Sequence, residues 1–338
     1  MQLFELTRQL IDIESITPNE REVGDFLWHL LSQLARRFGG KAERMPVEKD
    51  RDNIFVQFGN PVVVLSTHMD TVPPFFPSRE DNDHIWGRGA CDTKGIIAAM
   101  ITAAEQLLQT GIKNFGLLFV VGEERNSAGA HLAAQTPRGS KYIINGEPTD
   151  NKLALGSKGA LRYEIVAQGR MAHSAYPELG ESAIEKLLDA LEKIRRVPLP
   201  ADPILGRCTL NIGTIHGGRA PNVIPDSAMA EVFIRVVGDV ADLRGAIEKA
   251  ARPETEAKEA LFIPAVHLGS LDGFETTVVA FTTDIPAFGD VWGQPFLIGP
   301  GSIHVAHTSE EHIPKSQLVE AVTIYRNLVE RLLLRNSS

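Results

Sequence analysis

The first half of the chain alternates between two hydrophobic patterns. Residues 2–13 and 20–37 place apolar side chains three and four positions apart, which predicts two amphipathic helices. A third helix is predicted at 94–111, where an Ala- and Leu-rich segment ends at Gly111, a residue suited to a helix C-terminus. Continuous apolar runs predict buried strands at 61–67, 115–121 and 141–145. Buried strands that alternate with helices predict an α/β domain with a largely parallel sheet covered on both faces.

The pattern changes near residue 157. Apolar and polar side chains now alternate along 160–169 and 229–237, which is typical of antiparallel strands with one face in water. Helical periodicity predicts further helices at 181–196, 239–251 and 316–334. The change of pattern therefore predicts a second, α+β arrangement inserted into the first.

This insertion defines the expected domains. We expect an inserted α+β domain at residues 158–270 and a discontinuous first domain formed by residues 1–157 and 271–338. The apolar run at 294–301 returns to the buried-strand pattern of the first domain. Two domains also suit a chain of 338 residues, since single cores usually stop growing near ~250–300 residues.

Composition narrows the classes of function. The chain has 43% hydrophobic and 23% charged residues, as ordinary soluble globular proteins do. A net charge of −9 without a long basic run argues against nucleic acid binding, and no apolar stretch approaches the ~20 residues of a membrane span. The N-terminus lacks a basic region followed by an apolar one, so we expect no signal peptide. Cys91 and Cys208 form no disulfide framework, and we expect a cytoplasmic protein.

Acidic and histidine side chains follow the predicted strands of the first domain. Ligands of open α/β sheets sit at the carboxyl ends of the strands, so these side chains are expected at one edge. One further acid, Asp92, lies just before the predicted helix at 94–111. The side chains after the strands are His68, Asp70, Glu123, Glu124, Glu147 and His307.

Each of these residues has an ordinary structural explanation when taken alone. An Asp before a helix is commonly an N-cap, and a Glu at a strand end is commonly solvated. Their coincidence at one sheet edge favours a metal site instead. Histidines with several carboxylates suit Zn²⁺, Mn²⁺ or Co²⁺, and two ions about 3.5–4 Å apart would account for so many acids.

Five segments carry a recognisable combination of motifs: STHMDTVP, WGRGACDTKGIIAAM, VVGEERNSAGA, INGEPTD and GPGSIHVAHTSEEHI. In order and spacing they resemble the M20 family of dinuclear metallopeptidases and deacylases. The resemblance continues through GRMAHSAYPELGESAI and IHGGRAPNVIPDSAMAEVFIR in the inserted domain, so it covers essentially the whole chain. It implies a zinc-peptidase-like catalytic domain and a ferredoxin-like α+β lid that serves in dimerisation.

The resemblance also implies the metal ligands. His68 and Glu147 would bind one ion, and Glu124 and His307 would bind the other. Asp92 would bridge the two ions, which are expected to be Zn²⁺, with Co²⁺ or Mn²⁺ as alternatives.

Two further roles follow from the same resemblance. Asp70 would accept the other ring N–H of His68 and so fix its tautomer. Glu123 would be the general base of a reaction in which the metals activate water. The peptide bond between Asp92 and Thr93 is expected to be cis.

Four more residues are expected to contact substrate. By resemblance, His173 would donate to the oxyanion, in its own or in a partner subunit, and Asn222 would contact substrate. Arg235 could clamp a substrate carboxylate, and Gly301 could let the backbone approach a ligand closely. Without the resemblance, each of these four residues has an ordinary explanation: in the same order, a loop histidine, a turn residue, a solvated strand arginine and a flexible glycine.

The expected activity is hydrolysis of the acyl amide bond of an N-acyl amino acid, as in acetylornithine deacetylase or succinyl-diaminopimelate desuccinylase. The compact chain, with a short segment before the last strand, favours such amino-acid biosynthetic deacylases within the family. A carboxypeptidase or a di- or tripeptidase is the alternative among enzymes. A metal-free binding or scaffold protein on the same fold is the alternative from another class.

Overall fold

The computed structural model describes residues 2–337 and divides into two compact units. The first comprises residues up to Leu155, Leu268–Thr277 and the chain from Thr283 onward, and the second comprises Gly156–His267 and Val278–Thr282. Compared with the expected boundaries, residues 268–270 lie in the first unit instead of the second, and residues 156–157 and the segment 278–282 lie in the second instead of the first. For the segment 278–282, the reason is a backbone hydrogen bond from Lys158 N to Val279 O (3.0 Å), which ties this segment to the start of the second unit.

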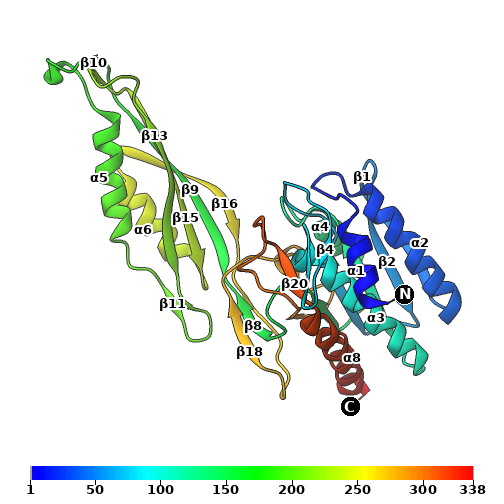
Figure 1. Ribbon diagram of the computed structural model, residues 1–338. Coiled ribbons are helices and arrows are strands. Elements are labelled where there is room, and N and C mark those ends of the chain that lie inside the picture. Colours follow the sequence, from blue (N-terminus) through cyan, green and yellow to red (C-terminus); the bar gives the residue numbers. More distant parts are fainter. Residues whose placement is uncertain (1, 338) are drawn as a thin grey trace. The chain divides into compact units, whose positions relative to one another are not determined.

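The first unit is built on a six-stranded sheet with the order β1-β2-β6-β3-β7-β19 (Figure 1). Four adjacent strands, β6, β3, β7 and β19, are parallel, which confirms the predicted mostly parallel sheet. The antiparallel hairpin β1–β2 was not predicted, because β1 is largely polar and lies at the sheet edge. The strands are β1 (Lys41–Glu48), β2 (Arg51–Phe58), β3 (Val63–His68), β6 (Phe115–Val120), β7 (Tyr142–Asn145) and β19 (Gln294–Leu297).

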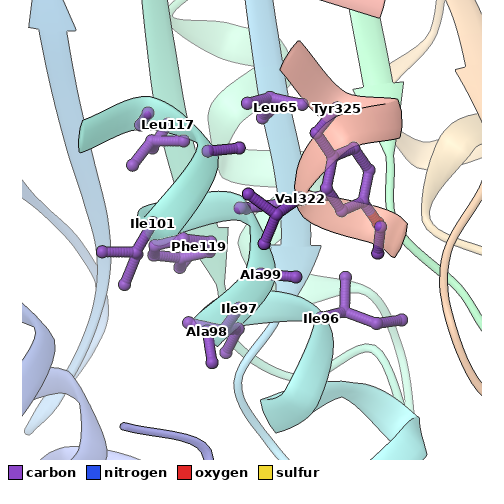
Figure 2. Close-up of a cluster of buried hydrophobic side chains, with 14 of the residues drawn as sticks. Leu65, Ile96, Ile97, Ala98, Ala99, Ile101, Leu117, Phe119, Val322 and Tyr325 are labelled. Atoms are coloured by element: carbon purple, nitrogen blue, oxygen red, sulfur yellow. The ribbon is translucent and has the colours of Figure 1, made fainter. Parts of the chain in front are cut away.

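Helices cover both faces of this sheet because its strands are apolar on both sides. Side chains such as Leu65 and Phe119 pack with α1, α2, α3 and α8, whereas their chain neighbours Val64 and Val120 pack with α4 and α7. Figure 2 shows the sheet residue Leu65, the α3 residue Ala99 and the α8 residue Val322 in one buried cluster. The helices are α1 (Leu3–Ile11), α2 (Arg21–Phe38), α3 (Gly95–Gln109), α4 (Ala128–Gln135), α7 (Ile285–Phe288) and α8 (Lys315–Ser337).

The second unit has the βαββαβ order of a ferredoxin-like fold, as the resemblance implied. Its four-stranded sheet, ordered β13-β15-β9-β16, is antiparallel throughout. Alternate residues such as Tyr163 and Val232 are buried in one core with α5 and α6. The elements are β9 (Gly159–Gln168), α5 (Ala183–Arg195), β13 (Thr209–Gly217), β15 (Ser227–Val236), α6 (Ala241–Ala251) and β16 (Thr255–Ile263).

Short elements complete the fold. The turn η1 (Ala90–Lys94) precedes α3, and η2 (Pro177–Leu179) precedes α5. None of the helices within residues 2–337 combines the length and apolarity needed to cross a membrane. The short strands are β4 (Arg79–Glu80), β5 (His84–Trp86), β8 (Leu153–Ser157), β10 (Ala172–His173), β11 (Ala201–Asp202), β12 (Gly206–Arg207), β14 (Val223–Ile224), β17 (Val266–His267), β18 (Thr276–Val279) and β20 (His312–Pro314).

Candidate active site

The predicted ligands follow strands that are neighbours in the sheet of the first unit. His68 is the last residue of β3 and pairs with Val120, the last residue of β6. Glu124 follows β6 by four residues, and Glu147 follows β7 by two. Since these strands are parallel and in register, their carboxyl ends deliver the side chains to one edge of the sheet.

Asp92 lies at the centre of the cluster. Its Oδ1 is 3.0 Å from His68 Nε2, and its Oδ2 is 3.2 Å from His307 Nε2. Asp92 lies within η1 with non-helical dihedral angles (φ −124°, ψ 84°), and its peptide bond to Thr93 is cis, as the resemblance implied. Each oxygen of this one carboxylate therefore contacts a different imidazole.

Glu124 and Glu147 are the two further candidate ligands. Glu124 Oε2 lies 3.1 Å from His307 Nε2, and ligand atoms of His68, Asp92 and Glu124 all lie within 4.8 Å of one another. Glu147 is 4% exposed, and within the described residues its Oε1 has no hydrogen-bond partner. A buried carboxylate oxygen without a partner is costly unless a cation binds it.

The electrostatics of the site also fit divalent cations. Burial raises the pKa of Glu123 and Glu147 well above the ordinary value, because the charged forms lose hydration. Hydrogen bonds to Asp92 and Glu124 raise the pKa of His307 to about 10. The carboxylates outnumber the two imidazoles, and such a set of oxygen and nitrogen donors suits Zn²⁺ or similar ions.

Asp70 has a wider set of contacts than expected. Its Oδ1 accepts hydrogen bonds from the backbone N–H groups of Gly122 (3.0 Å) and Glu123 (3.2 Å), and its Oδ2 accepts from Glu124 N (3.2 Å). Oδ2 also accepts from the Thr17 hydroxyl at 2.6 Å. One buried carboxylate thus holds the whole turn that carries both glutamates.

The Nδ1 atom of His68 faces two oxygens of Asp70. Nδ1 lies 3.0 Å from the backbone oxygen of Asp70, whereas the carboxylate Oδ1 is 3.5 Å away. The carbonyl is therefore the better acceptor for the Nδ1 proton, and it leaves Nε2 free to act as a ligand. Burial alone would raise the pKa of Asp70, but contacts with His68, Thr17 and the backbone lower it.

Asp284, to which the sequence analysis gave no role, is buried near this site. It is 1% exposed, and burial raises its pKa to about 7. Its charge adds to the influences that raise the pKa of Glu123 and Glu147. In the sequence, the Thr-Asp pair at 283–284 is the signal from which this acid could have been predicted.

Three of the expected substrate residues lie in the second unit. The loops of His173 and Asn222 are adjacent, since Ser174 N donates to Asn222 O at 3.0 Å and β10 pairs with β14. Arg235 is on β15, partly buried, with its guanidinium 4.8 Å from the centre of the Phe233 ring.

The fourth expected substrate residue, Gly301, lies in the first unit and has a packing role. Its φ is +89°, and a Cβ at this position would lie 2.5 Å from the Cβ of Cys91. The close approach that requires glycine is therefore to Cys91. Contact of Gly301 with substrate remains a prediction.

The sequence profile of the peptidase family M20/M25/M40 matches residues 64–331. The chain belongs to this family. The predicted resemblance is thereby confirmed, and the protein is a metal-dependent hydrolase of amide bonds. The family binds two metals, and the cluster around Asp92 is a candidate site for them.

Curated relatives and solved structures agree with this assignment. A Schizosaccharomyces pombe peptidase M20 domain-containing protein is 40% identical (97% of this chain, 84% of that protein), and a probable carboxypeptidase of Aspergillus terreus is 39% identical (96% and 84%). A Staphylococcus aureus tripeptidase has the same fold, with a TM-score of 0.78 at 20% identity (97% and 98%). Bacillus subtilis YXEP, described as a dinuclear metal-binding peptidase, gives 0.68 at 16% identity (98% and 97%).

Proposed function

We propose that the protein is a two-metal amidohydrolase that releases an amino acid with a free carboxylate from an N-acyl amino acid. One observation carries this proposal: Asp92 directs its two oxygens to two different histidines, as a carboxylate between two ions does. His68 and Glu147 would complete the coordination of one ion, and Glu124 and His307 would complete that of the other. Zn²⁺ suits this donor set best, and Co²⁺ and Mn²⁺ remain candidates.

The reaction needs a base beside the ions, and Glu123 is proposed for it. When bound, the two ions would polarise the scissile carbonyl and lower the pKa of water. Glu123 would take the proton of the attacking water at its carboxylate and return it to the leaving nitrogen. Its neighbour Glu124 is proposed as a ligand, so the turn held by Asp70 sets the distance between base and metal.

Arg235 is proposed to bind the substrate carboxylate. Within residues 2–337 it forms no ion pair, and burial lowers its pKa because the guanidinium is partly desolvated. A partly buried cation without an anion is a suitable partner for a carboxylate ligand.

His173 is proposed as the oxyanion donor, with Asn222 beside it. The Nδ1 atom of His173 accepts a hydrogen bond from Ala175 N at 3.1 Å, so in the neutral ring the proton is on Nε2. The exposed side chain can therefore present an N–H donor to substrate, and the adjacent Asn222 loop can contact the same ligand.

A carboxypeptidase acting on short peptides is the second candidate. The naming of a 39% identical relative as a probable carboxypeptidase favours it. Both candidates release an amino acid that carries a free carboxylate, so Arg235 would have the same role in each.

We also propose a cytoplasmic homodimer formed through the second unit. The edge strand β13 carries Ile215, which is 53% exposed, and the neighbouring helix α5 carries Leu188, which is 48% exposed. An unpaired strand edge with apolar side chains is suited to pairing with a second copy.

A substrate panel with defined metals tests the proposal. Metal-free protein would be reloaded with Zn²⁺, Co²⁺ or Mn²⁺ and assayed on N-acetylornithine, succinyl-diaminopimelate and dipeptides. We expect turnover of an N-acyl amino acid to exceed that of the dipeptides, and the same substrates with an amidated carboxylate to react poorly. Faster dipeptide cleavage would favour the carboxypeptidase, and absence of both turnover and metal binding would contradict the proposal.

A further inference from the structure

A buried ion pair, Arg88–Glu311, contacts the backbone of Asp92. Arg88 is 1% exposed and Glu311 is 0% exposed, and Arg88 Nη1 lies 2.5 Å from Glu311 Oε2. The other oxygen of Glu311, Oε1, accepts hydrogen bonds from the backbone N–H groups of Cys91 and Asp92, both at 3.3 Å. Neither Arg88 nor Glu311 has a part in the chemistry proposed above.

The two N–H groups need this acceptor because of the local backbone. Cys91 and Asp92 lie in η1, where Asp92 departs from helical geometry, before α3 begins at Gly95. Buried N–H groups outside regular structure must find a partner elsewhere, or they cost free energy. The partner comes from a position 220 residues away from Cys91.

Glu311 also belongs to the segment that carries His307. It follows His307 by four residues, and its backbone oxygen accepts a hydrogen bond from Gly87 N at 3.1 Å. Arg88 is fixed in turn, since its Nε donates to Pro74 O at 3.2 Å. The Glu311 side chain therefore connects the segment that carries Asp92 to the segment that carries His307.

We infer that Glu311 is a positioning residue for the two-metal centre, because its Oε1 holds the Asp92 backbone in register with His307. This inference rests on the ligand roles proposed above. Glu311 acts through Asp92 and does not itself contact an ion. If the Asp92 backbone shifts, the two carboxylate oxygens of Asp92 can no longer reach His68 and His307 at the same time. Asp92 then no longer serves as the ligand shared by both ions.

A pair of double variants isolates the acceptor oxygen from the ion pair. Arg88→Met/Glu311→Gln removes both charges and keeps an amide oxygen for the two N–H groups. Arg88→Met/Glu311→Leu removes both charges and the acceptor at similar side-chain volume. Because both charges leave together, neither variant buries an unpaired ion. Leu27→Ala, at a fully buried position of α2, serves as a control that destabilises the core and leaves the sequence of η1 and Glu311 unchanged.

The readout is Zn²⁺ affinity of each folded variant, measured by competition with a chelator, together with the melting temperature of the metal-free form. We expect the Leu double variant to bind Zn²⁺ about 10- to 100-fold more weakly than the Gln double variant, as for residues that orient metal ligands. Leu27→Ala should lower the melting temperature and leave Zn²⁺ affinity unchanged. Equal Zn²⁺ affinity of the two double variants would overturn the inference.

If the double variants do not fold, a single variant still tests the inference. Glu311→Asp keeps the charge for Arg88 but is too short to keep both contacts, so we expect weaker Zn²⁺ binding with a folded protein. Parental affinity in this variant would also overturn the inference. Failure of the parent protein itself to bind Zn²⁺ would instead contradict the proposed function, so the two failures are distinguishable.

Discussion

The carboxylate of Asp70 holds the backbone of Glu123, with Oδ1 3.2 Å from the Glu123 nitrogen. Three consecutive N–H groups, from Gly122 to Glu124, point at this one side chain. Asp70 therefore positions the proposed base and the adjacent proposed ligand through their main chain. Its influence extends beyond the orientation of His68.

Replacing Asp70 by Asn tests this arrangement. The amide brings an NH₂ donor into a site filled with donors, so we expect a stability loss on the order of 1–3 kcal/mol for each buried donor left unpaired. Turnover should fall about 10- to 100-fold, because both glutamates shift. Thr17→Val is the matched control, which removes only the 2.6 Å hydroxyl contact and should cost about 1 kcal/mol. Denaturant unfolding and kcat would be measured together, and parental kcat in Asp70→Asn would contradict this role.

The two adjacent glutamates should respond differently to the same substitution. Glu123→Gln should retain both metal ions and lose about 10²- to 10⁴-fold in kcat, because only the proton acceptor is removed. Glu124→Gln should lose bound metal, since a neutral amide replaces an anionic ligand. Metal content by elemental analysis, measured beside kcat, separates the two. Loss of metal in Glu123→Gln would reverse the assignment.

Removal of the metals should reduce stability as well as activity. A ligand that binds only the folded protein adds about 2.7 kcal/mol at a free concentration 100 times its Kd. We therefore expect chelator-treated protein to be inactive and to melt at a lower temperature, with both properties restored by Zn²⁺. Calorimetry at several Zn²⁺ concentrations measures the shift, and a melting temperature independent of Zn²⁺ would argue against a site in the folded chain.

The packing role of Gly301 predicts an unequal cost for two Gly→Ala substitutions. Gly301 and Gly111 have similar φ values of +89° and +84°, which cost an alanine about 1–2 kcal/mol. At Gly111 no atom lies within 4 Å of the added Cβ, whereas at Gly301 the Cβ of Cys91 lies 2.5 Å away. We expect Gly301→Ala to cost about 1–3 kcal/mol more in unfolding free energy.

A second substitution checks the cause of that difference. Cys91→Gly removes the Cβ that the new methyl group meets, so it should recover part of the loss in the Gly301→Ala background. Cys91→Ala keeps the Cβ and should recover none of it. Additive effects of Gly301→Ala and Cys91→Gly would show that the contact is not the source of the cost.

Periodicity predicted α1, α2, α3, α8 and the parallel strands of the first unit from sequence alone, but it did not predict the short helices α4 and α7. The predicted helix at 20–37 is Arg21–Phe38, and the predicted strand at 115–121 is Phe115–Val120. The polar edge strand β1 gave no such signal, because an exposed edge does not require apolar residues. Four of the five proposed metal ligands, all but Asp92, could be predicted because they lie at or after the ends of strands, and parallel strands end at one edge of the sheet.

The supporting contacts were decided only by the tertiary structure. Thr17 and the 122–124 turn, which donate hydrogen bonds to Asp70, lie more than 50 residues from it in the chain, and Glu311 lies 220 residues from Cys91. A buried N–H group in an irregular turn requires an acceptor, but no pattern of neighbouring residues states which distant carboxylate will supply it. The sequence by itself therefore determined which side chains reach the sheet edge. Packing decided which buried acids hold them in place, because those contacts form only when distant segments meet.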